Sequence, residues 1–393
     1  MGAGEVTETT PFAVTNVRLL DGGDLGYVER GGFLVNADGR IAAIDANYTP
    51  APGVRVVDGQ GLWCLPGFVD AHSHIGLSTK GESGDSADGN EATEAVTADV
   101  RALDGLNPRD PAIPETLAAG VTTAYVTMGS ANVIGGIGCT VHLAGRTVEE
   151  MVMVPAGGMK AAMGENPRRV HGANAKRRPA SRPGVAAVLR EWLERARRYA
   201  NQPPLGARDY NPKLEALAMV VRGDVPLRVH CHRADDIATA HRIASEFGLK
   251  WVMDHATESH FILDDVVGWG VPAVVGPSFG AANKAETRHK SFATPGILAR
   301  AGVATAICSD HPVIPSQYLA IYAGLAVRAG MPESLALAAI TSVPADIVGV
   351  GDRVGSLRVG LEADFSLFTD NPMSHVQATT RAVYIGGQQV SGT

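Results

Sequence analysis

Four short apolar runs of this chain each end at a residue of the kind that binds metal ions. The runs at 65–69, 226–229, 251–254 and 303–309 lead into His72 with His74, His230, His255 and Asp310. Imidazole and carboxylate groups rarely occupy the buried end of an apolar strand for packing reasons alone. Because alternate side chains of a strand share a face, His72 and His74 point the same way, as two ligands of one ion do. The pattern therefore requires a fold that brings the ends of several buried strands together.

The order of strand-like and helical stretches predicts such a fold. Between residues 67 and 345, short apolar runs alternate with Ala- and Leu-rich helical stretches, which is typical of βα repeats around a parallel sheet. In a TIM-type barrel the functional groups gather at the C-terminal ends of the strands. Each candidate ligand lies at such an end, so the predicted fold and the predicted site support each other.

Both ends of the chain have a different pattern. Residues 12–66 alternate with a period of two, and short strands return after residue 364. The predicted fold class is therefore α/β, a (β/α)8 TIM-type barrel with a small β-sandwich subdomain built from both chain termini. We place the subdomain at residues 1–66 plus 350–393 and the metal-dependent barrel at 67–349.

Composition narrows the class of partner. A chain of 393 residues with a net charge of −7 and no polybasic block is unlike a protein that binds nucleic acid or an anionic membrane. The first eight residues lack a basic start followed by an apolar core, so a cytoplasmic location is predicted. The partner expected is a small-molecule substrate; the sequence assigns no self-complementary patch, and so no oligomeric state is predicted. The four widely spaced cysteines are expected to be free and buried.

Taken together, these motifs resemble the amidohydrolase superfamily, close to its imidazolonepropionase-like branch. The resemblance covers nearly the whole chain and is carried by residues 65–74, 120–123, 309–310, 355–357 and 360–364. It implies that His72 and His74 are ligands from the first barrel strand, His230 from the fifth and His255 from the sixth, with Asp310 as the acid of the eighth. The implied cofactor is one or two Zn²⁺ ions, with Mn²⁺, Fe²⁺ or Co²⁺ as alternatives.

Superfamily members with two metal ions need a bridging anion, either a carboxylate or a lysine that carries carbon dioxide. Glu165 and Lys160 are the two candidates, and a spacing of five residues puts them on opposite faces of a strand. We favour Glu165 as the metal ligand because it lies at the end of its run. A site with one ion that uses neither residue is the alternative.

The expected chemistry is attack by a metal-activated water, with Asp310 as general base and His255 and His232 beside the reacting carbonyl. His232 faces the barrel mouth together with His230 and is a catalytic candidate rather than a ligand. Lys284 and His289 lie on the predicted seventh βα loop, and with His311 they are the candidates for substrate binding. The polar stretch at 78–114 is expected to lie over the mouth.

Several functions remain open at this point. The first is a hydrolase that cleaves a non-peptide C–N bond in a cyclic or linear amide. The alternatives are a deaminase of a heterocyclic amine, a biosynthetic enzyme that closes a ring, and a non-catalytic scaffold. A scaffold predicts eroded ligands, whereas every expected ligand position is intact. The turn Ser309-Asp310-His311-Pro312 also departs from the imidazolonepropionase pattern, so that substrate is not transferred.

Overall fold

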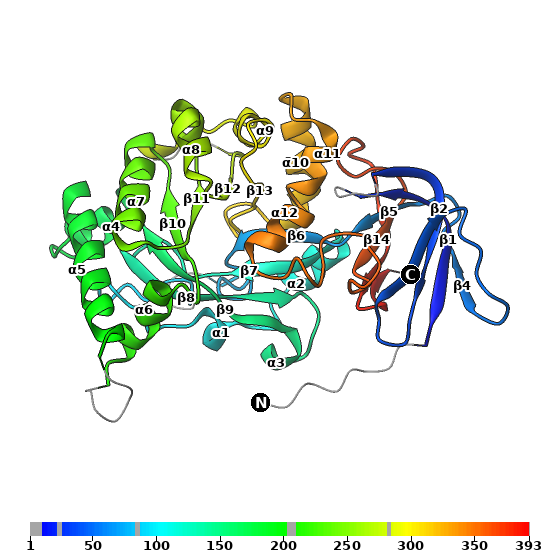
Figure 1. Cartoon of the computed structure of the whole chain (residues 1–393), viewed down its shortest axis with the longest axis horizontal. Helices are drawn as coiled ribbons and strands as arrows, with labels where there is room; N and C mark the ends of the chain where they lie inside the picture. Colours follow the sequence, from blue (N-terminus) through cyan, green and yellow to red (C-terminus); the bar gives the residue numbers. More distant parts are fainter. Residues whose placement is uncertain (1–9, 22–25, 83–86, 203–209, 281–283, 393) are drawn as a thin grey trace.

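The computed structural model describes residues 10–21, 26–82, 87–202, 210–280 and 284–392. Two eight-stranded sheets organise these residues. Figure 1 shows that one sheet forms a barrel with helices around it, and that the other forms a separate β unit at one end of the molecule.

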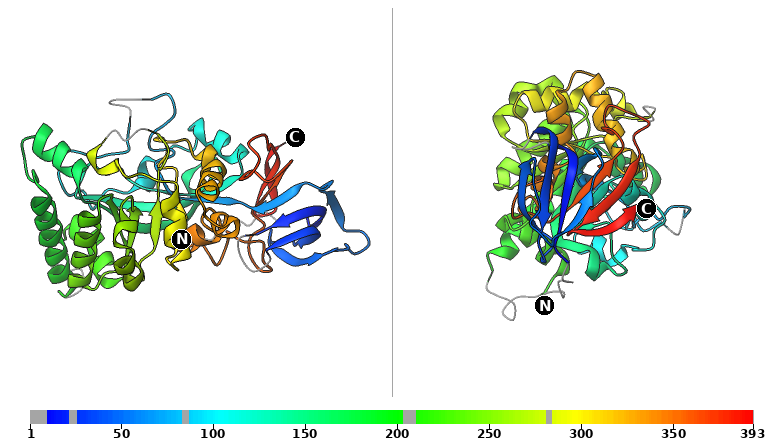
Figure 2. Two further views of the ribbon diagram at one scale, coloured as in Figure 1. Left: turned by 90° about the horizontal axis from the view of Figure 1, so that it is seen from above. Right: turned by 90° about the vertical axis from the view of Figure 1, so that its right-hand side faces the viewer.

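The β unit combines strands from both ends of the chain. Its strands are β1 (Phe12–Leu20), β2 (Tyr27–Val35), β3 (Ile41–Ala46), β4 (Arg55–Asp58), β5 (Trp63–Pro66), β14 (Phe365–Phe368), β15 (Thr380–Ile385) and β16 (Gln388–Gly392). They pair in the order β16-β15-β14-β5-β1-β2-β3, with β4 beside β1. Phe33 and Phe365 meet edge to face at 4.9 Å between ring centres in its core. Figure 2 shows these first and last strands side by side, as the sequence predicts; the exact division at residues 66 and 350 stays a prediction.

The barrel sheet is nearly closed. Its strands are β6 (Phe68–Ser73), β7 (Val121–Val126), β8 (Ile134–His142), β9 (Val152–Ala162), β10 (Leu227–Cys231), β11 (Trp251–His255), β12 (Ala273–Val275) and β13 (Thr305–Ile307), paired in this order around the barrel. The first and last strands meet where the N–H of Asp310 donates to the carbonyl of His72 at 3.1 Å. The buried carboxylate of Asp70 also accepts hydrogen bonds from the N–H and hydroxyl groups of Ser309.

One strand departs from regular βα repeats. Strand β8 runs antiparallel to both β7 and β9, whereas the other neighbouring pairs of the barrel are parallel. The connection from β7 to β8, residues 127–133, is too short for a parallel crossover, which needs a dozen residues or more. The sequence pattern did not reveal this hairpin.

The helices surround the barrel and pack their apolar faces against it. They are α1 (Ala102–Gly105), α2 (Ala112–Ala118), α3 (Val148–Met151), α4 (Glu165–Pro167), α5 (Arg182–Ala200), α6 (Pro212–Arg222), α7 (Ala234–Phe247), α8 (Leu263–Trp269), α9 (Ala293–Arg300), α10 (Leu319–Arg328), α11 (Glu333–Ala338) and α12 (Ser342–Ile347). Short helical turns span Arg168–Asn174, Ser259–Ile262, Ala285–Thr287 and Ser316–Tyr318. Helix α5 begins where the Ser181 hydroxyl accepts from the N–H of Gly184, and α7 ends at Gly248 with φ +65°.

Two further predictions concern the chain as a whole. Cys64, Cys139, Cys231 and Cys308 are all free and buried, as expected. Within the described ranges, none of the helices combines the length and the apolar character that crossing a membrane requires.

Candidate metal centre

The barrel mouth holds two adjoining groups of ligand-type side chains. His72, His74 and Asp310 offer ligand atoms within 4.8 Å of one another, and so do His230, His232 and His255. The two groups touch, because the ring centres of His72 and His255 are 4.8 Å apart. The structure thus brings together the residues that end the four apolar runs of the sequence.

Hydrogen bonds orient most of these rings. In three histidines Nδ1 lies within hydrogen-bond distance of a neighbouring oxygen: His74 with Thr127 O at 2.6 Å, His255 with Gly276 O at 2.7 Å and His232 with Thr257 Oγ1 at 2.7 Å. Nδ1 of His72 lies 3.2 Å from Asp254 Oδ2. Partners of this kind fix the ring orientation and leave Nε2 available to a metal ion.

Backbone conformation at two of the strand ends is unusual. His255, Ala256 and Asp310 have φ values of +71°, +48° and +56°. Residues with a Cβ atom adopt this region at a cost of about 1–2 kcal/mol each, and such strain concentrates at functional sites. His255 is the last residue of β11, Ala256 follows it, and Asp310 lies three residues after β13, so the unusual conformations occur where the strands end at the barrel mouth.

Lys160, not Glu165, contacts the histidines. The Lys160 ammonium nitrogen lies 3.2 Å from Nε2 of His72, and its side chain is buried in the barrel. Gly135 on β8 makes room for it, since a Cβ there would lie 3.3 Å from Lys160 Cγ. Glu165 instead begins helix α4, where its N–H donates to Glu286 Oε2 at 2.8 Å. The long lysine thus reaches His72 from two residues inside β9, whereas no contact of the Glu165 carboxylate with these histidines occurs among the described residues.

A buried ion pair supports His72 from below. The carboxylate of Asp254, which contacts His72, also accepts hydrogen bonds from Arg228 at 2.7 and 3.4 Å. Arg228 further donates to Ala71 O at 2.8 Å, and its guanidinium lies 4.1 Å from the centre of the Tyr125 ring. Both charged residues are fully buried. Sequence reasoning missed them, although a charged residue inside an otherwise apolar run was the available signal.

The protonation states of this cluster suit a metal ion. Burial lowers the pKa of His72 to about 3 and that of His255 to about 4, and it holds the pKa values of His230 and His232 well below the usual range. Burial would raise the pKa of Asp310, but contacts with the histidines, His74 foremost, hold it below its ordinary value. Neutral imidazoles and an ionised carboxylate are the forms that bind divalent cations. Nδ1 of His230 is also buried and has no hydrogen-bond partner within the described residues, as expected of a ligand atom.

Comparison with known proteins identifies the family of this chain. The model of the amidohydrolase family matches residues 63–390. The chain belongs to the amidohydrolase family. It is 31% identical over 390 residues to amidohydrolase tasK of Hapsidospora irregularis. The aligned region covers 92% of this chain and 39% of tasK. The chain therefore spans about two fifths of the length of that relative.

Two other proteins show how far the likeness extends. An amidohydrolase from Thermotoga maritima MSB8 is 37% identical, and its structure superposes with a TM-score of 0.93 over 97% of this chain and 100% of that chain. An imidazolonepropionase from Stenotrophomonas maltophilia is 44% identical over 68 residues, 16% of either chain. The fold of this amidohydrolase is thus that of a solved relative over its whole length, while the likeness to the imidazolonepropionase is local.

A pocket of about 240 Å³ opens above the cluster. Its walls are His74, Ser78, Gly89, Asn90, Gly129, Ser130, His230, His232, Pro277, Lys284, Thr287, Lys290, Asp310 and Val313. Part of the predicted overhanging loop, at Ser78, Gly89 and Asn90, does line the mouth; residues 83–86 of that loop lie outside the described ranges. Lys290 was missed by sequence reasoning, although it lies on the same loop as Lys284.

Two of the predicted substrate-binding residues lie elsewhere. The nearest acid to His289 is Glu258, with Nδ1 and Oε1 3.9 Å apart, and the ring packs against Phe261. His311 is buried, and its Nδ1 accepts from the N–H of Ser316 at 3.4 Å. Neither lines the pocket, because the chain turns between Lys284 and His289 and again after Asp310. Only Lys284 of the three faces the mouth.

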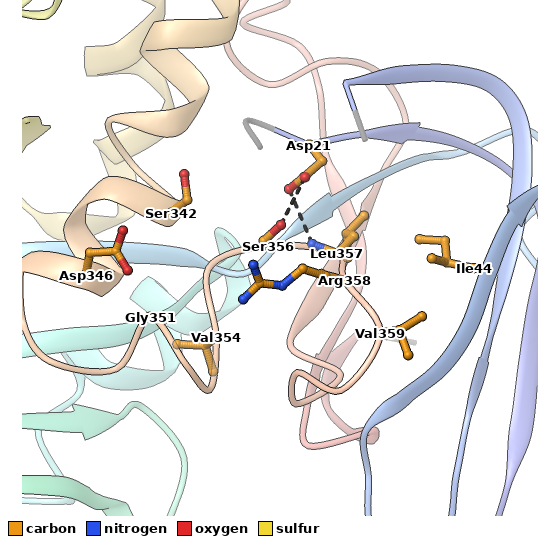
Figure 3. Close-up of a pocket in the computed structure, with 10 residues that line it drawn as sticks. All are labelled: Asp21, Ile44, Ser342, Asp346, Gly351, Val354, Ser356, Leu357, Arg358 and Val359. Atoms are coloured by element: carbon orange, nitrogen blue, oxygen red, sulfur yellow. Dashed lines mark hydrogen bonds between the residues drawn. The ribbon is translucent and has the colours of Figure 1, made fainter. Parts of the chain in front are cut away.

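A larger cavity, about 510 Å³, lies at the junction of the barrel and the β unit (Figure 3). Its side chains include Asp346 on α12 and Arg358, which points toward the same side of the cavity, while Asp21 accepts from Ser356 at 3.0 Å. No group of metal-ligand type gathers among its lining residues. The two ligand-type groups of the barrel mouth adjoin the smaller pocket instead.

A third ligand-type group lies nearby, at His142, Glu362 and Asp364. Arg353 donates to Glu362 at 2.7 Å, and Arg40 lies 3.7 Å from the same carboxylate. Two guanidinium groups already balance this acidic pair, which makes the position unfavourable for a further cation.

Proposed function

We propose that this amidohydrolase is a metal-dependent hydrolase that cleaves a C–N bond outside peptide linkages, in a linear or cyclic amide. The observation that carries the proposal is the convergence of His72, His74, His230 and His255 with Asp310 and Lys160 at the mouth of the barrel. His72, His74, His230 and His255 are the residues that would hold the metal, with Asp310 beside them. Zn²⁺ is the expected ion, with Mn²⁺, Fe²⁺ or Co²⁺ as alternatives, and the expected location is the cytoplasm.

Lys160, in place of Glu165, is the proposed bridging residue between two ions. Burial lowers the pKa of Lys160, which favours the neutral amine. A neutral amine attacks carbon dioxide, forms an N–C bond and loses a proton, which yields a carbamate with a carboxylate-like charge. The contact of 3.2 Å with His72 supports this assignment, since a ligand must lie beside the other ligands. A single-ion site that leaves Lys160 unmodified is the alternative.

The chain's own groups then supply the proton transfers. A bound Zn²⁺-type ion lowers the pKa of a bound water to about 7. Asp310, 3.2 Å from Nε2 of His74, is positioned to accept the proton of the attacking water and to pass it to the leaving nitrogen. When the Thr257 hydroxyl donates to Nδ1 of His232, Nε2–H of His232 faces the pocket and donates to the developing oxyanion.

The lining of the pocket favours an amide over the alternatives. Its described lining residues include no Phe, Tyr or Trp side chain on which a heterocyclic amine could stack, and the imidazoles among them belong to the ligand-type cluster. The intact ligand set also argues against a non-catalytic scaffold. A ring-closing reaction uses the same groups in reverse, so the direction of the reaction is to be read from equilibrium measurements.

Metal analysis and one variant test the proposal. Protein purified without chelator should contain one to two divalent ions per chain, and Asp310→Asn should retain most of them while losing roughly 10²–10⁴-fold in turnover. His289→Gln, outside the pocket, is the matched control and should keep wild-type activity. A panel of N-acyl amino acids, dipeptides, lactams and hydantoins supplies the substrate. Protein nearly free of metal, or an active Asp310→Asn variant, would overturn the proposal.

A separate measurement tests the bridge. Protein exchanged into ¹³C-bicarbonate should show a carbamate carbon resonance by NMR, and Lys160→Met should lose both this resonance and the second ion. A wild-type protein with two ions and no carbamate resonance would exclude Lys160 as the bridge.

A further inference from the structure

The pocket above the histidines has two ammonium groups on one wall. Lys284 and Lys290 line it together with His230, His232 and Asp310. Across the described parts of the chain, no ion pair or side-chain hydrogen bond links either ammonium group to another residue. The nearest acid along the chain, Glu286, is already engaged by the N–H of Glu165 and by Arg182. Neither ammonium group thus has a carboxylate within ion-pair distance in the described parts of the chain, although Glu286, Asp310 and Glu165 act on Lys284 from farther away.

The electrostatics of this wall are unfavourable without an anion. Burial lowers the pKa values of both lysines, and the charge of Lys284 lowers the pKa of Lys290 further. Asp310 is the carboxylate in the pocket lining, and it is held by His74 at 3.2 Å. A negatively charged group placed between the two lysines would relieve their repulsion, and the partial burial of both side chains strengthens that attraction.

The remaining lining limits the size and polarity of the ligand. Ser78, Asn90, Ser130 and Thr287 offer hydroxyl and amide groups around the opening. The volume of about 240 Å³ corresponds to about eight water molecules at ~30 Å³ each, which suits a small polar molecule.

We propose that the substrate is a small amide that carries a carboxylate, held by Lys284 and Lys290 while its C–N bond lies at Asp310 and His232. This inference rests on the proposed hydrolase function and narrows it to one substrate class, such as a short N-acyl amino acid or a carboxylated cyclic amide. Lysine binds an anion as a point charge on a flexible stem and does not demand bidentate geometry. A phosphate could meet the same charges, so the experiments compare the two anions.

Binding without turnover is the first test. Succinate, succinamide and methylphosphonate are titrated into the metal-loaded Asp310→Asn protein by calorimetry. Succinate should bind at least 10-fold tighter than succinamide and tighter than methylphosphonate, and Lys284→Met/Lys290→Met should remove that preference. Lys250→Met, which precedes β11 at the far end of the barrel, is the matched control and should bind like its parent. Equal succinate affinity in the double variant and its parent would overturn the inference, and a preference for methylphosphonate would overturn the choice of carboxylate.

Activity gives the second test and separates the two proposals. For N-acyl amino acids, Lys290→Met should raise KM about 10- to 100-fold with kcat within a few-fold of wild type, whereas the corresponding N-acyl amino amides should be unaffected. If wild type and the double variant hydrolyse the substrates with the same preference for N-acyl amino acids over N-acyl amino amides, the inference is refuted. The proposed hydrolase function is not affected by that result. Absence of metal and of all hydrolysis refutes the hydrolase itself. The succinate titration is then made on the metal-free protein, where the lysine variants should still lose binding.

Discussion

The ion pair beneath His72 allows a quantitative prediction about stability. Arg228 and Asp254 are fully buried, and their closest N–O distance is 2.7 Å. Arg228→Met keeps most of the side-chain volume but leaves the Asp254 carboxylate without its cation. Breaking a buried ion pair by removing one partner costs about 3–5 kcal/mol, because an uncompensated charge remains. At about 2 °C of melting temperature per kcal/mol for a domain of this size, Arg228→Met should melt roughly 6–10 °C lower.

A double-mutant cycle tests the physical reason. Thermal melts of metal-free protein are compared for Arg228→Met, Asp254→Asn and the double variant. The double variant removes both charges and should melt above Arg228→Met, because the buried carboxylate that caused the loss is gone. Arg222→Met breaks the exposed pair with Asp224 and should cost at most about 1 kcal/mol, which makes it a matched control.

Two results would refute the reasoning. One is an Arg228→Met protein that melts within about 2 °C of wild type, which would mean that the buried carboxylate finds another partner. The other is a double variant whose loss equals the sum of the two single losses, because additivity would show that the charges do not interact.

Two further predictions concern the β unit and the thiols. Gly39 has φ +71°, and a Cβ there would lie 2.1 Å from Gly386 O, whereas Gly53 has φ +86° and open space around it. In urea melts, Gly39→Ala should therefore be less stable than Gly53→Ala by about 1–3 kcal/mol. Equal losses of stability would contradict the contact between the two chain ends. Burial raises the pKa values of the four cysteines, that of Cys139 to about 12. At pH 8 the native protein should therefore show no rapid reaction with a thiol reagent, whereas the denatured protein should titrate four thiols. A thiol that reacts rapidly in the native protein would contradict the burial of the cysteines.

Local patterns predicted well which ligand-type side chains gather at the barrel mouth, because the information is local. A strand end is marked by a short apolar run, and the side-chain period of two decides which residues face the mouth. His72, His74 and His255 could therefore be placed without knowing how the strands pair. The β unit was predictable for the same reason, since period-two runs at both ends of the chain have buried faces to cover.

The features that the sequence did not indicate depend on interactions that are not local. The short β7–β8 connection imposes a hairpin, although β8 itself reads like any other buried strand. Glu165 was favoured over Lys160 because a ligand was expected at the end of its run. Lys160 lies two residues before the end of β9, and its long side chain still reaches His72. The expectation that ligands occur at strand ends does not take the length of the side chain into account.

The charged groups inside the barrel link the stability of the fold to the site. TIM-type barrels usually fill their interior with layers of branched aliphatic side chains. Here Gly158 on β9 makes room for Arg228, since a Cβ would lie 2.9 Å from its Cγ, and Gly138 on β8 makes room for the Tyr125 hydroxyl. Asp254 contacts both Arg228 and His72, so one carboxylate balances the buried cation and contacts a ring of the ligand-type cluster. A substitution of Asp254 therefore alters both the charge balance of the barrel interior and the position of His72, which links the stability of the fold to the proposed metal centre.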